Sequence, residues 1–364
     1  MSYAKCYYPV HETDGPARRP AAASAPRRQC AMKLETAIDL TTEFKCSLGI
    51  EVGSRGLRAA LVTRDAQIIE SARGISAPLT AQSAMEQMFA LVEQLLDHPR
   101  AKRWDVETIG VAFGGPVDAG RGVTLDGLRA TGFESFPLGG LIEERFEVPV
   151  LLENDSRAAA IGEYRFGAGR GAHGLLYMQL GIGVGGGIVL NGRLLRGAGM
   201  TAGELGHMPV SATGPRCSCG KPGHLEAFVS EPALIKRAQD ALDDLTTAET
   251  QSDTLSIEQV FADDAVEDVK KVASEATQMI GMATANIVTA LSCDTVVLGG
   301  YAARIGNSFI GSVRARIRQY SLESALRRLI VSPAQLGSDA ALLGATSLAY
   351  ERLDNPEEFY AIVM

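Results

Sequence analysis

The sequence predicts an α/β protein with parallel or mixed sheets. Short runs rich in Val, Ile and Leu alternate with segments whose apolar residues recur at helical spacing, and this alternation is typical of such sheets. Several strand-like runs end in glycine pairs, at residues 114–115 and 299–300. Because ligand loops in α/β proteins follow the carboxyl ends of strands, these turns indicate where a ligand binds.

The expected elements begin near Cys46. Three strand-like runs over residues 46–53, 57–65 and 67–75 form a β-meander, and residues 81–96 carry apolar side chains at helical spacing. Further strands are expected at residues 108–118, 148–155, 175–180, 185–195 and 294–300. Further helices are expected at residues 156–167, twice within 255–291, and at 337–353.

Size and charge exclude several classes of protein. The 364 residues are enough for two domains. The formal net charge of −8 gives no sign of a basic surface that tracks phosphates, so we do not expect nucleic acid as a partner. We find no apolar run of membrane-spanning length and no signal-peptide core, and therefore expect a cytoplasmic protein without a membrane partner. Six cysteines in a chain of this size do not indicate a disulfide scaffold.

Residues 1–46 differ from the rest in composition. The stretch 16–31 holds four arginines, no acidic residue and many Pro and Ala residues, which predicts a disordered segment. It is either a basic arm that binds a partner, or a solvated leader with Met32 as an alternative start. It is short for a helix-turn-helix domain and lacks the paired amphipathic helices that such a domain needs.

The run GIGVGGG at residues 181–187 contains a G-x-G-x-x-G match. A dinucleotide-binding fingerprint requires a strand, a turn and then a helix, whereas these glycines lead into the strand-like run IVLNGRLL. Two interpretations remain. One is a turn between two strands in which backbone N–H groups, including those near Gly181 and Gly183, bind a phosphate. The other is an ordinary tight hairpin.

His207, Cys217, Cys219 and His224 lie within eighteen residues of one another on a Gly- and Pro-rich segment. Two thiolates and two imidazoles are common ligands of tetrahedral Zn²⁺, and four protein ligands would make the site structural. The alternative is a flexible loop with two unpaired thiols.

Acidic side chains surround the glycine loops. Glu153, Asn154 and Asp155 follow a strand and precede a helix, where Asn and Asp are also favoured as helix caps. Glu204 lies three residues before His207, and Glu226 follows the cysteines. Each is individually typical of a solvent-exposed group. Together they suggest a polyol site, because a sugar needs several fixed donors and acceptors.

Several motifs resemble those of the ROK family of bacterial sugar kinases and sugar-responsive repressors. They are ENDSRAAAIGEYRFGAGRG, the glycine loop, and above all GELGH followed by CSCGKPGHLE. The resemblance covers residues 47–350 and implies a two-lobed, actin-like (ribonuclease H-like) ATPase fold and a homodimer or homotetramer. We expect an N-terminal lobe of residues 47–152 plus about 337–364, and a C-terminal lobe of residues 153–336 that carries the zinc loop.

The resemblance also implies roles for single residues. Asp155 would be the catalytic base, and Asn154, Glu204, His207 and Glu226 would bind the sugar hydroxyls together with Asp155. His207 would bind zinc through its other ring nitrogen, alongside Cys217 and Cys219. The family's third cysteine is replaced by His224, which is a competent ligand of structural Zn²⁺.

The nucleotide-binding side departs from the family pattern. The resemblance implies nucleotide contacts at Gly53, Ser54, Arg55, Gly181, Gly183, Gly299 and Gly300. The family's kinases carry Asp-x-Gly-Gly-Thr-Lys in the first phosphate loop, whereas residues 51–56 read EVGSRG. Ile182 replaces a threonine in the second loop. Backbone N–H groups still cradle phosphates in such loops, and Arg55 or Arg58 would partly replace the lost charge.

Two functions follow from these observations. The first is a sugar kinase that uses ATP and Mg²⁺ to phosphorylate a hexose or an N-acylhexosamine. The second is a kinase-inactive sugar sensor or transcriptional regulator of the repressor branch, without its DNA-binding domain. A relic without any ligand is a third alternative.

Overall fold

The computed structural model of the chain describes residues 44–74, 80–126, 131–243 and 255–357. Most of the segment predicted to be disordered, residues 1–43, lies outside the described residues. The predicted boundary at residue 46 is wrong, because the first strand already begins at Phe44. Parallel pairing opposite Trp104 extends this strand, and the rings of Phe44 and Trp104 lie 5.1 Å apart.

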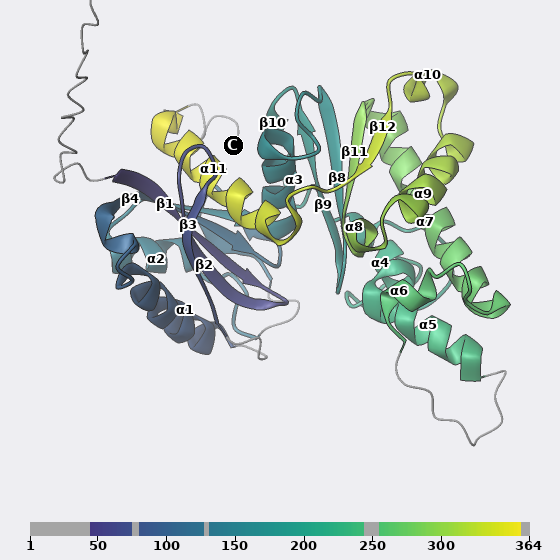
Figure 1. The fold of residues 1–364 in the computed structure, drawn as a ribbon, viewed down its shortest axis with the longest axis horizontal. Coiled ribbons are helices and arrows are strands. Elements are labelled where there is room, and N and C mark those ends of the chain that lie inside the picture. Colours follow the sequence, from purple (N-terminus) through teal and green to yellow (C-terminus); the bar gives the residue numbers. More distant parts are fainter. Residues whose placement is uncertain (1–43, 75–79, 127–130, 244–254, 358–364) are drawn as a thin grey trace, which may run out of the picture. The chain divides into compact units, whose positions relative to one another are not determined.

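Two five-stranded sheets lie within the compact unit of residues 43–364 (Figure 1). The first sheet has the order β3-β2-β1-β4-β7 and the second has the order β10-β9-β8-β11-β12. The strands of the first sheet are β1 (Phe44–Gly53), β2 (Gly56–Val62), β3 (Ile68–Arg73), β4 (Trp104–Phe113) and β7 (Val150–Asn154). The strands of the second are β8 (Gly174–Leu180), β9 (Val184–Leu190), β10 (Arg193–Leu194), β11 (Thr295–Gly300) and β12 (Ile330–Pro333).

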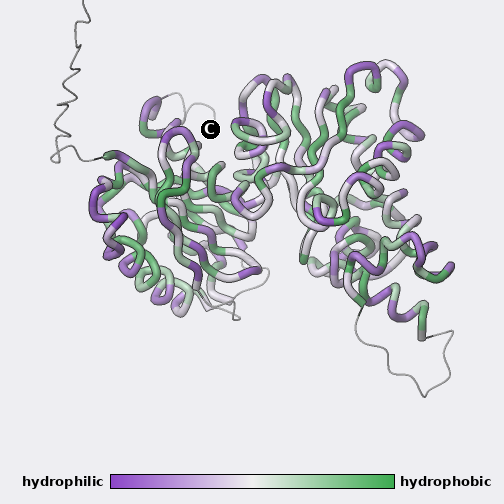
Figure 2. The backbone as a smooth tube through the Cα atoms, viewed as in Figure 1, coloured by the Kyte–Doolittle hydropathy of each residue, from purple (hydrophilic) through white to green (hydrophobic). Residues whose placement is uncertain are grey.

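The two sheets share one topology. In each, the first three strands along the chain form an antiparallel meander, and the last two are parallel to the first. A small ribbon of β5 (Val117–Asp118) and β6 (Val123–Thr124) follows β4. Both sheets are therefore mixed, as predicted. Hydrophobic residues run along the strands of both sheets (Figure 2), and the two largest buried clusters are built on β1, β2 and β4 and on β8 and β11.

Helices separate and cover the strands. Those that precede β8 are α1 (Ala81–Leu96), α2 (Leu138–Phe146) and α3 (Asp155–Phe166), with the 3₁₀ helix η1 (Ala101–Arg103). Those that follow it are η2 (Leu205–His207), α4 (Leu225–Val229), α5 (Glu231–Asp243), α6 (Ile257–Val260), α7 (Glu267–Leu291), α8 (Tyr301–Ile305), α9 (Asn307–Tyr320), α10 (Glu323–Leu326), η3 (Gly337–Asp339) and α11 (Ala340–Asp354).

Helices α3 and α11 connect the two sheets. Each follows the last strand of one sheet but packs on the other: α11 contacts β1, β4 and β7, and α3 contacts β8 and β9. The two helices also pack against each other through small residues. A Cβ on Gly344 would stand 1.7 Å from the carbonyl oxygen of Ala158, and a Cβ on Gly162 would stand 2.3 Å from that of Ala340. This close crossing fixes the start of α3, where the candidate catalytic residue lies.

Most predicted elements are confirmed, with corrections at their ends. Asp155 is not the end of a strand but the first residue of α3. The run 185–195 is two strands rather than one, because Asn191 and Gly192 have φ of 50° and 81° and form a turn. An Asn-Gly pair between alternating residues signals such a turn. The sequence patterns do not predict α2, α4, α5, α8, α9, α10, β6 or β12.

Candidate functional site

One cavity brings together loops from both sheets. It is lined by the β1–β2 turn, the end of β4, the β7–α3 junction, the β8–β9 hairpin and the segment around η2. Ten of the fifteen residues given a catalytic, binding or metal role in the sequence line it, as do Arg58 and Ile182: Gly53, Ser54, Arg55, Asn154, Asp155, Gly181, Gly183, Glu204, His207 and Glu226. The remaining ones, Cys217, Cys219, His224, Gly299 and Gly300, are not part of its wall.

Asn154 caps helix α3. Its side-chain oxygen accepts hydrogen bonds from the backbone N–H groups of Ser156 and Arg157 at 3.1 and 3.0 Å, and its amide nitrogen donates to the carbonyl oxygen of Gly115 at 3.0 Å. The capping alternative is therefore what the structure shows, on a residue that also lines the cavity. The cap holds the β7–α3 junction against the turn after β4.

Asp155 is the next residue and opens the helix. Its Oδ1 accepts hydrogen bonds from the backbone N–H of Ser156 at 2.6 Å and from the Ser156 hydroxyl at 3.1 Å. Its Oδ2 lies toward Gly114, where a Cβ would stand 3.5 Å away, and both residues line the cavity. A carboxylate at this end of a helix interacts favourably with the macrodipole. Asp155 is thus a fixed anionic acceptor at the wall of the cavity.

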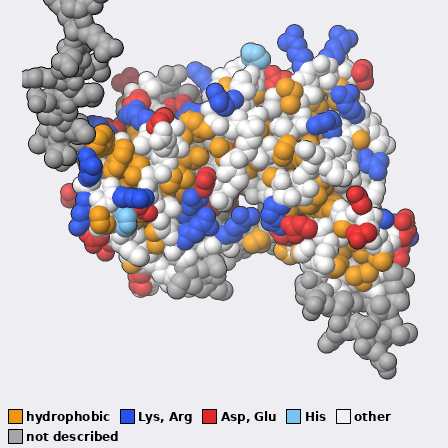
Figure 3. All heavy atoms as spheres, in the orientation of Figure 1, with side chains coloured by type: hydrophobic (Ala, Val, Ile, Leu, Met, Phe, Trp, Pro, Cys, Tyr) orange, Lys and Arg blue, Asp and Glu red, His pale blue; other side chains and the backbone are white. Residues whose placement is uncertain are grey.

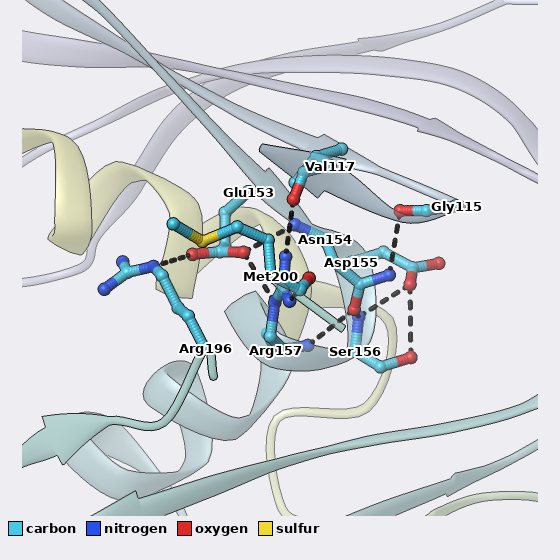
Figure 4. Close-up of polar contacts among 9 residues, drawn as sticks. All are labelled: Gly115, Val117, Glu153, Asn154, Asp155, Ser156, Arg157, Arg196 and Met200. Carbon is cyan, nitrogen blue, oxygen red and sulfur yellow. Dashed lines mark hydrogen bonds and ion pairs between the residues drawn. The ribbon is translucent and has the colours of Figure 1, made fainter. Parts of the chain in front are cut away.

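A buried ion network supports this junction from behind (Figure 4). Glu153 is fully buried, and its two oxygens each accept a hydrogen bond at 2.7 Å, one from Arg157 Nε and one from Arg196 Nε. Arg157 also donates to the carbonyl oxygens of Val117 and Met200. Burial by itself would raise the pKa of Glu153, but the two guanidinium groups outweigh burial and lower that pKa.

Glu204 and His207 lie together at the segment that η2 forms. The carboxylate of Glu204 is 4.0 Å from His207 Nε2, while His207 Nδ1 is 3.4 Å from Cys217 Sγ. Burial raises the pKa of Glu204, and His207 partly opposes this shift. His207 therefore presents one ring nitrogen toward Glu204 and the other toward the cysteine. This is the arrangement expected of a residue shared by two sites.

Glu226, in the first turn of α4, ties the β8–β9 hairpin to the cysteine loop. Its Oε2 accepts from the backbone N–H of Val184 at 2.9 Å, and its Oε1 accepts from the Ser218 hydroxyl at 2.8 Å. Gly206 permits the close approach of η2, because a Cβ there would stand 2.3 Å from the carbonyl oxygen of Val184.

The four candidate metal ligands converge. The ligand atoms of His207, Cys217, Cys219 and His224 all lie within 4.8 Å of one another, and Cys219 Sγ is 3.2 Å from His224 Nδ1. Two sulfur and two nitrogen donors at these separations fit tetrahedral Zn²⁺ in both number and kind. Cys217 is buried, and burial raises the pKa of its thiol, so a bound cation would favour the thiolate that burial disfavours.

The second glycine loop is a hairpin between β8 and β9, closed by a hydrogen bond from Gly181 N to Gly183 O at 3.0 Å. Ile182 projects from its tip and is 43% exposed. Among the described residues, no backbone hydrogen bond uses the N–H of Ile182 or Gly183. Both residues line the cavity, so the hairpin brings two backbone N–H groups of the kind that bind phosphate to its wall.

Gly299 and Gly300 are not among the residues that line the cavity. They end β11 opposite Gln179 and Leu180. Gly300 has a φ of 69°, and a Cβ on it would stand 1.8 Å from the carbonyl oxygen of Leu180. Glycine is needed at Gly300 because β11 and β8 approach closely, whereas a Cβ on Gly299 would meet the side chains of Tyr177 and Gln179, which line the cavity. Nucleotide contact at this pair stays a prediction.

Several residues of the cavity wall carry no motif by which the sequence would reveal them, including Glu51, Arg73, Tyr177 and Gln179. Burial raises the pKa of Glu51, and the carboxylate of Asp155 raises it further. Glu51 and Asp155 are therefore electrostatic neighbours. The strand register of the β-meander is the signal that identifies Arg73 as a neighbour of Glu51, because Arg73 pairs with Arg58 and Arg58 pairs with Glu51.

None of the helices in the described part of the chain is both long enough and apolar enough to cross a membrane.

Comparison with known proteins relates this architecture to one family. The ROK family model matches residues 47–352. The chain is 31% identical over 305 residues to the N-acetylmannosamine kinase of Salmonella newport, which covers 83% of this chain and 98% of that protein. It is 28% identical over 310 residues to the putative xylose repressor of Caldicellulosiruptor sp., covering 83% and 77% of the two chains.

Among solved structures, a ROK family glucokinase from Streptomyces griseus, in complex with glucose and AMPPNP, superimposes with a TM-score of 0.73 at 27% identity. The match covers 84% of this chain and 99% of that one. The predicted fold class, a two-lobed actin-like ATPase fold with mixed sheets, is confirmed.

Proposed function

This chain belongs to the ROK family, and on that premise we propose that it is an ATP-dependent kinase of a hexose or an N-acylhexosamine. One observation carries the proposal: Asp155, at the start of α3, lies on the same cavity as Glu204, His207 and Glu226. A general base and several fixed hydrogen-bonding groups around one hollow are what phosphorylation of a sugar hydroxyl requires. Relatives named N-acetylmannosamine kinase and glucokinase support the choice of substrate class.

In the proposed reaction Asp155 accepts the proton of a primary hydroxyl. The sugar oxygen forms a bond to the γ-phosphorus of ATP, and the bond from that phosphorus to the ADP oxygen breaks. Ser156 holds Oδ1 of Asp155 through its N–H and hydroxyl, which orients the carboxylate. Glu204, His207 and Asn154 would bind the other hydroxyls. Positioning then supplies most of the rate enhancement, as in other phosphoryl transfers.

Two metal ions belong to this proposal. Glu51 and Asp155 offer neighbouring carboxylates of the kind that Mg²⁺ prefers, and bound Mg²⁺ would neutralise phosphate charge. His207, Cys217, Cys219 and His224 would hold a structural Zn²⁺, which would anchor the His207 ring. The chain's own residues also position the site: His207 Nε2 lies toward Glu204, and Glu226 joins the cysteine loop to the β8–β9 hairpin through two hydrogen bonds.

A second candidate is a kinase-inactive sugar sensor or regulator, which would use the same sugar pocket. The first phosphate loop lacks the family's second glycine, threonine and lysine, and Ile182 stands where the second loop usually has a hydroxyl. A relative named putative xylose repressor is consistent with this candidate. We favour the kinase because the β8–β9 hairpin, whose Ile182 and Gly183 N–H groups make no backbone hydrogen bond within the described residues, lines the same cavity as Asp155.

The test is ADP release by the purified, zinc-replete chain with Mg·ATP. Glucose, mannose, fructose, N-acetylglucosamine and N-acetylmannosamine are offered in turn, and Asp155→Asn serves as the blank. We expect turnover with one or more sugars and a loss of about 10²–10⁴ in rate in the variant, while sugar affinity is retained. Asp118→Asn, which changes a carboxylate outside the cavity wall, is the matched control and should keep its rate.

Turnover that survives in Asp155→Asn would remove this residue from the base role. Absence of turnover, with sugar still raising the melting temperature, would favour the sensor.

A further inference from the structure

A second hollow lies between four helices of the C-terminal half of the chain. Helices α6, α7, α8 and α9 line a space of about 400 Å³, which is within the range of small-molecule sites, roughly 300–1,000 Å³. Among the described residues, none that lines this hollow also lines the cavity with Asp155. The proposed kinase reaction therefore makes no use of it.

Much of the lining is apolar. Val260 and Phe309 are 0% and 3% exposed, and the ring of Phe261 meets that of Phe309 edge to face with centroids 4.9 Å apart. Ala273 on α7 and Ile305 at the end of α8 also line the hollow. An apolar surface of this size binds the hydrophobic body of a ligand.

Two cationic side chains come together at one serine of the lining. Nη2 of Arg316, on α9, lies 3.4 Å from the hydroxyl oxygen of Ser274, on α7. Lys270 precedes Ser274 by one helical turn, so both side chains project from the same face of α7. Within the described residues the ammonium group of Lys270 has no ion pair or hydrogen bond, whereas that of the adjacent Lys271 pairs with Asp268.

The rest of the polar lining is mostly hydroxyl groups. Ser308 and Ser312 lie one turn apart on α9, and the Ser312 hydroxyl donates to the carbonyl oxygen of Ser308 at 3.1 Å. The charged groups of the described lining are Lys270, Arg316 and Asp263, which leaves one excess positive charge. Acidic and basic side chains are interspersed over the helices at the right of Figure 3. The preference for an anion therefore comes from the two local cations and not from an extended field.

The aromatic part of the lining also holds helix α4. The ring of Tyr301 lies 6.1 Å from that of Phe261 and 5.8 Å from that of Phe309, between centroids. Its buried hydroxyl donates to the carbonyl oxygen of Val229, the last residue of α4, at 2.7 Å. The first turn of this five-residue helix carries Glu226, which lines the candidate active site. A ligand that packs on Phe261 and Phe309 therefore contacts the cluster that positions Glu226.

We propose that this hollow binds a small organic anion with an apolar body, and that its occupation changes the affinity of the sugar pocket. The apolar lining holds the body, while Lys270 and Arg316 bind the anionic head, a carboxylate or a phosphate. The binding site is argued from the hollow alone. The link to the sugar pocket rests on the proposed function, because that function assigns Glu226 to the sugar.

NMR titration of the full chain measures binding. Benzoate and phenyl phosphate probe the two head groups, and benzyl alcohol is the neutral probe. The variants are Lys270→Gln, Arg316→Gln and Ser312→Phe, of which the last narrows the hollow. Lys271→Gln is the matched control, because Lys271 adjoins Lys270 but is not part of the lining. None of these four side chains is buried, and melting temperatures verify that the variants fold.

We expect an anionic probe to bind, and Lys270→Gln and Arg316→Gln each to weaken it about fivefold or more, since a charged partner is lost. These two variants should bind benzyl alcohol as wild type does. Ser312→Phe should weaken all three probes, and Lys271→Gln should stay within about twofold of wild type. The anionic probe that binds more tightly identifies the head group. Failure of both anionic probes to bind at millimolar concentration would overturn the site, as would binding that survives in all three lining variants.

Calorimetry with glucose and N-acetylmannosamine, with and without the tighter anionic probe, tests the link. We expect sugar affinity to change about fivefold or more, and the sugar to change the affinity of the probe by the same factor. Tyr301→Phe removes the hydrogen bond to Val229 but is not a change in the lining, so the probe should still bind while the effect on sugar affinity is lost.

Sugar affinity that is the same with and without the probe would overturn the link, while the binding site would stand on the NMR result. Failure of both sugars to bind in the absence of the probe would count against the proposed function and the link together, whatever the NMR titration shows for the hollow.

Discussion

Arg196 Nε donates a hydrogen bond to Oε2 of Glu153 at a distance of 2.7 Å (Figure 4). This ion pair joins the loop after β10 to β7, the last strand of the first sheet. The other oxygen of Glu153 is held at the same distance by Arg157, on the helix that Asp155 opens. One fully buried carboxylate therefore fixes both a strand end and a helix start. The loop that it holds continues to Glu204, so the two halves of the candidate site share one anchor.

Replacing this anchor by Glu153→Gln should destabilise the protein strongly. Two buried guanidinium groups would lose their counter-charge, which costs about 3–5 kcal/mol. The exposed pair of Glu93 with Arg145 gives the matched control, Glu93→Gln, which should cost about 1 kcal/mol or less. Urea unfolding of both variants measures the difference. Equal losses would show that the buried network is not the anchor.

The same network predicts a pH dependence. The pKa of Glu153 in the folded chain lies below its ordinary value. Its ion pairs therefore stabilise the fold above the ordinary glutamate pKa, and this contribution is lost as pH falls through the folded pKa.

Glu204 should behave in the opposite way, because burial raises its pKa in the folded chain. Its stabilising contribution is present below the ordinary glutamate pKa and is lost as pH rises through the folded value. Glu204→Gln should therefore raise the melting temperature at pH 7 by a few degrees and have little effect near pH 4, while it weakens sugar binding. Melting curves across this range check the sign. A variant that melts lower than wild type at pH 7 would contradict the expectation.

Cys217→Ser should lower zinc content and sugar affinity together. Cys217 Sγ lies 3.4 Å from His207 Nδ1, so loss of the metal would release the ring that faces Glu204. We expect sugar affinity to fall about 10-fold or more. Lys221→Ala, an exposed change in the same loop, should alter neither quantity. Elemental analysis and calorimetry are the measurements, and wild-type protein with well under one zinc per chain would end the idea.

Gly344→Ala should disrupt the crossing of α3 and α11. The added Cβ would stand 1.7 Å from the carbonyl oxygen of Ala158, so the two helices must separate, at a cost of about 1–3 kcal/mol or more. Gly311→Ala in α9 is the matched control, because nothing lies within 4 Å of its Cβ position and alanine should stabilise that helix by about 0.4–1 kcal/mol. Unfolding curves in which both variants are less stable than wild type, or both are more stable, would contradict this account.

Local sequence signals determined the elements and the ligand types. Alternating apolar runs and helical spacing predict most strands and helices, and the spacing of Cys217, Cys219 and the two histidines predicts the ligand cluster, because those ligands come from one short segment. The residues 153–155 and the glycine hairpin were likewise visible as motifs. These features depend on neighbours in the chain, whose chemistry the sequence shows directly.

Only the tertiary structure decided which distant groups meet. The pairing of Glu153 with Arg196, the row of Glu51, Arg58 and Arg73, and the crossing of α3 with α11 all join segments far apart in the chain. It also showed that Gly300 makes a close contact with the carbonyl oxygen of Leu180 on the neighbouring strand. Strand register and helix crossing arise from burial summed over the whole fold, so no local pattern specifies them.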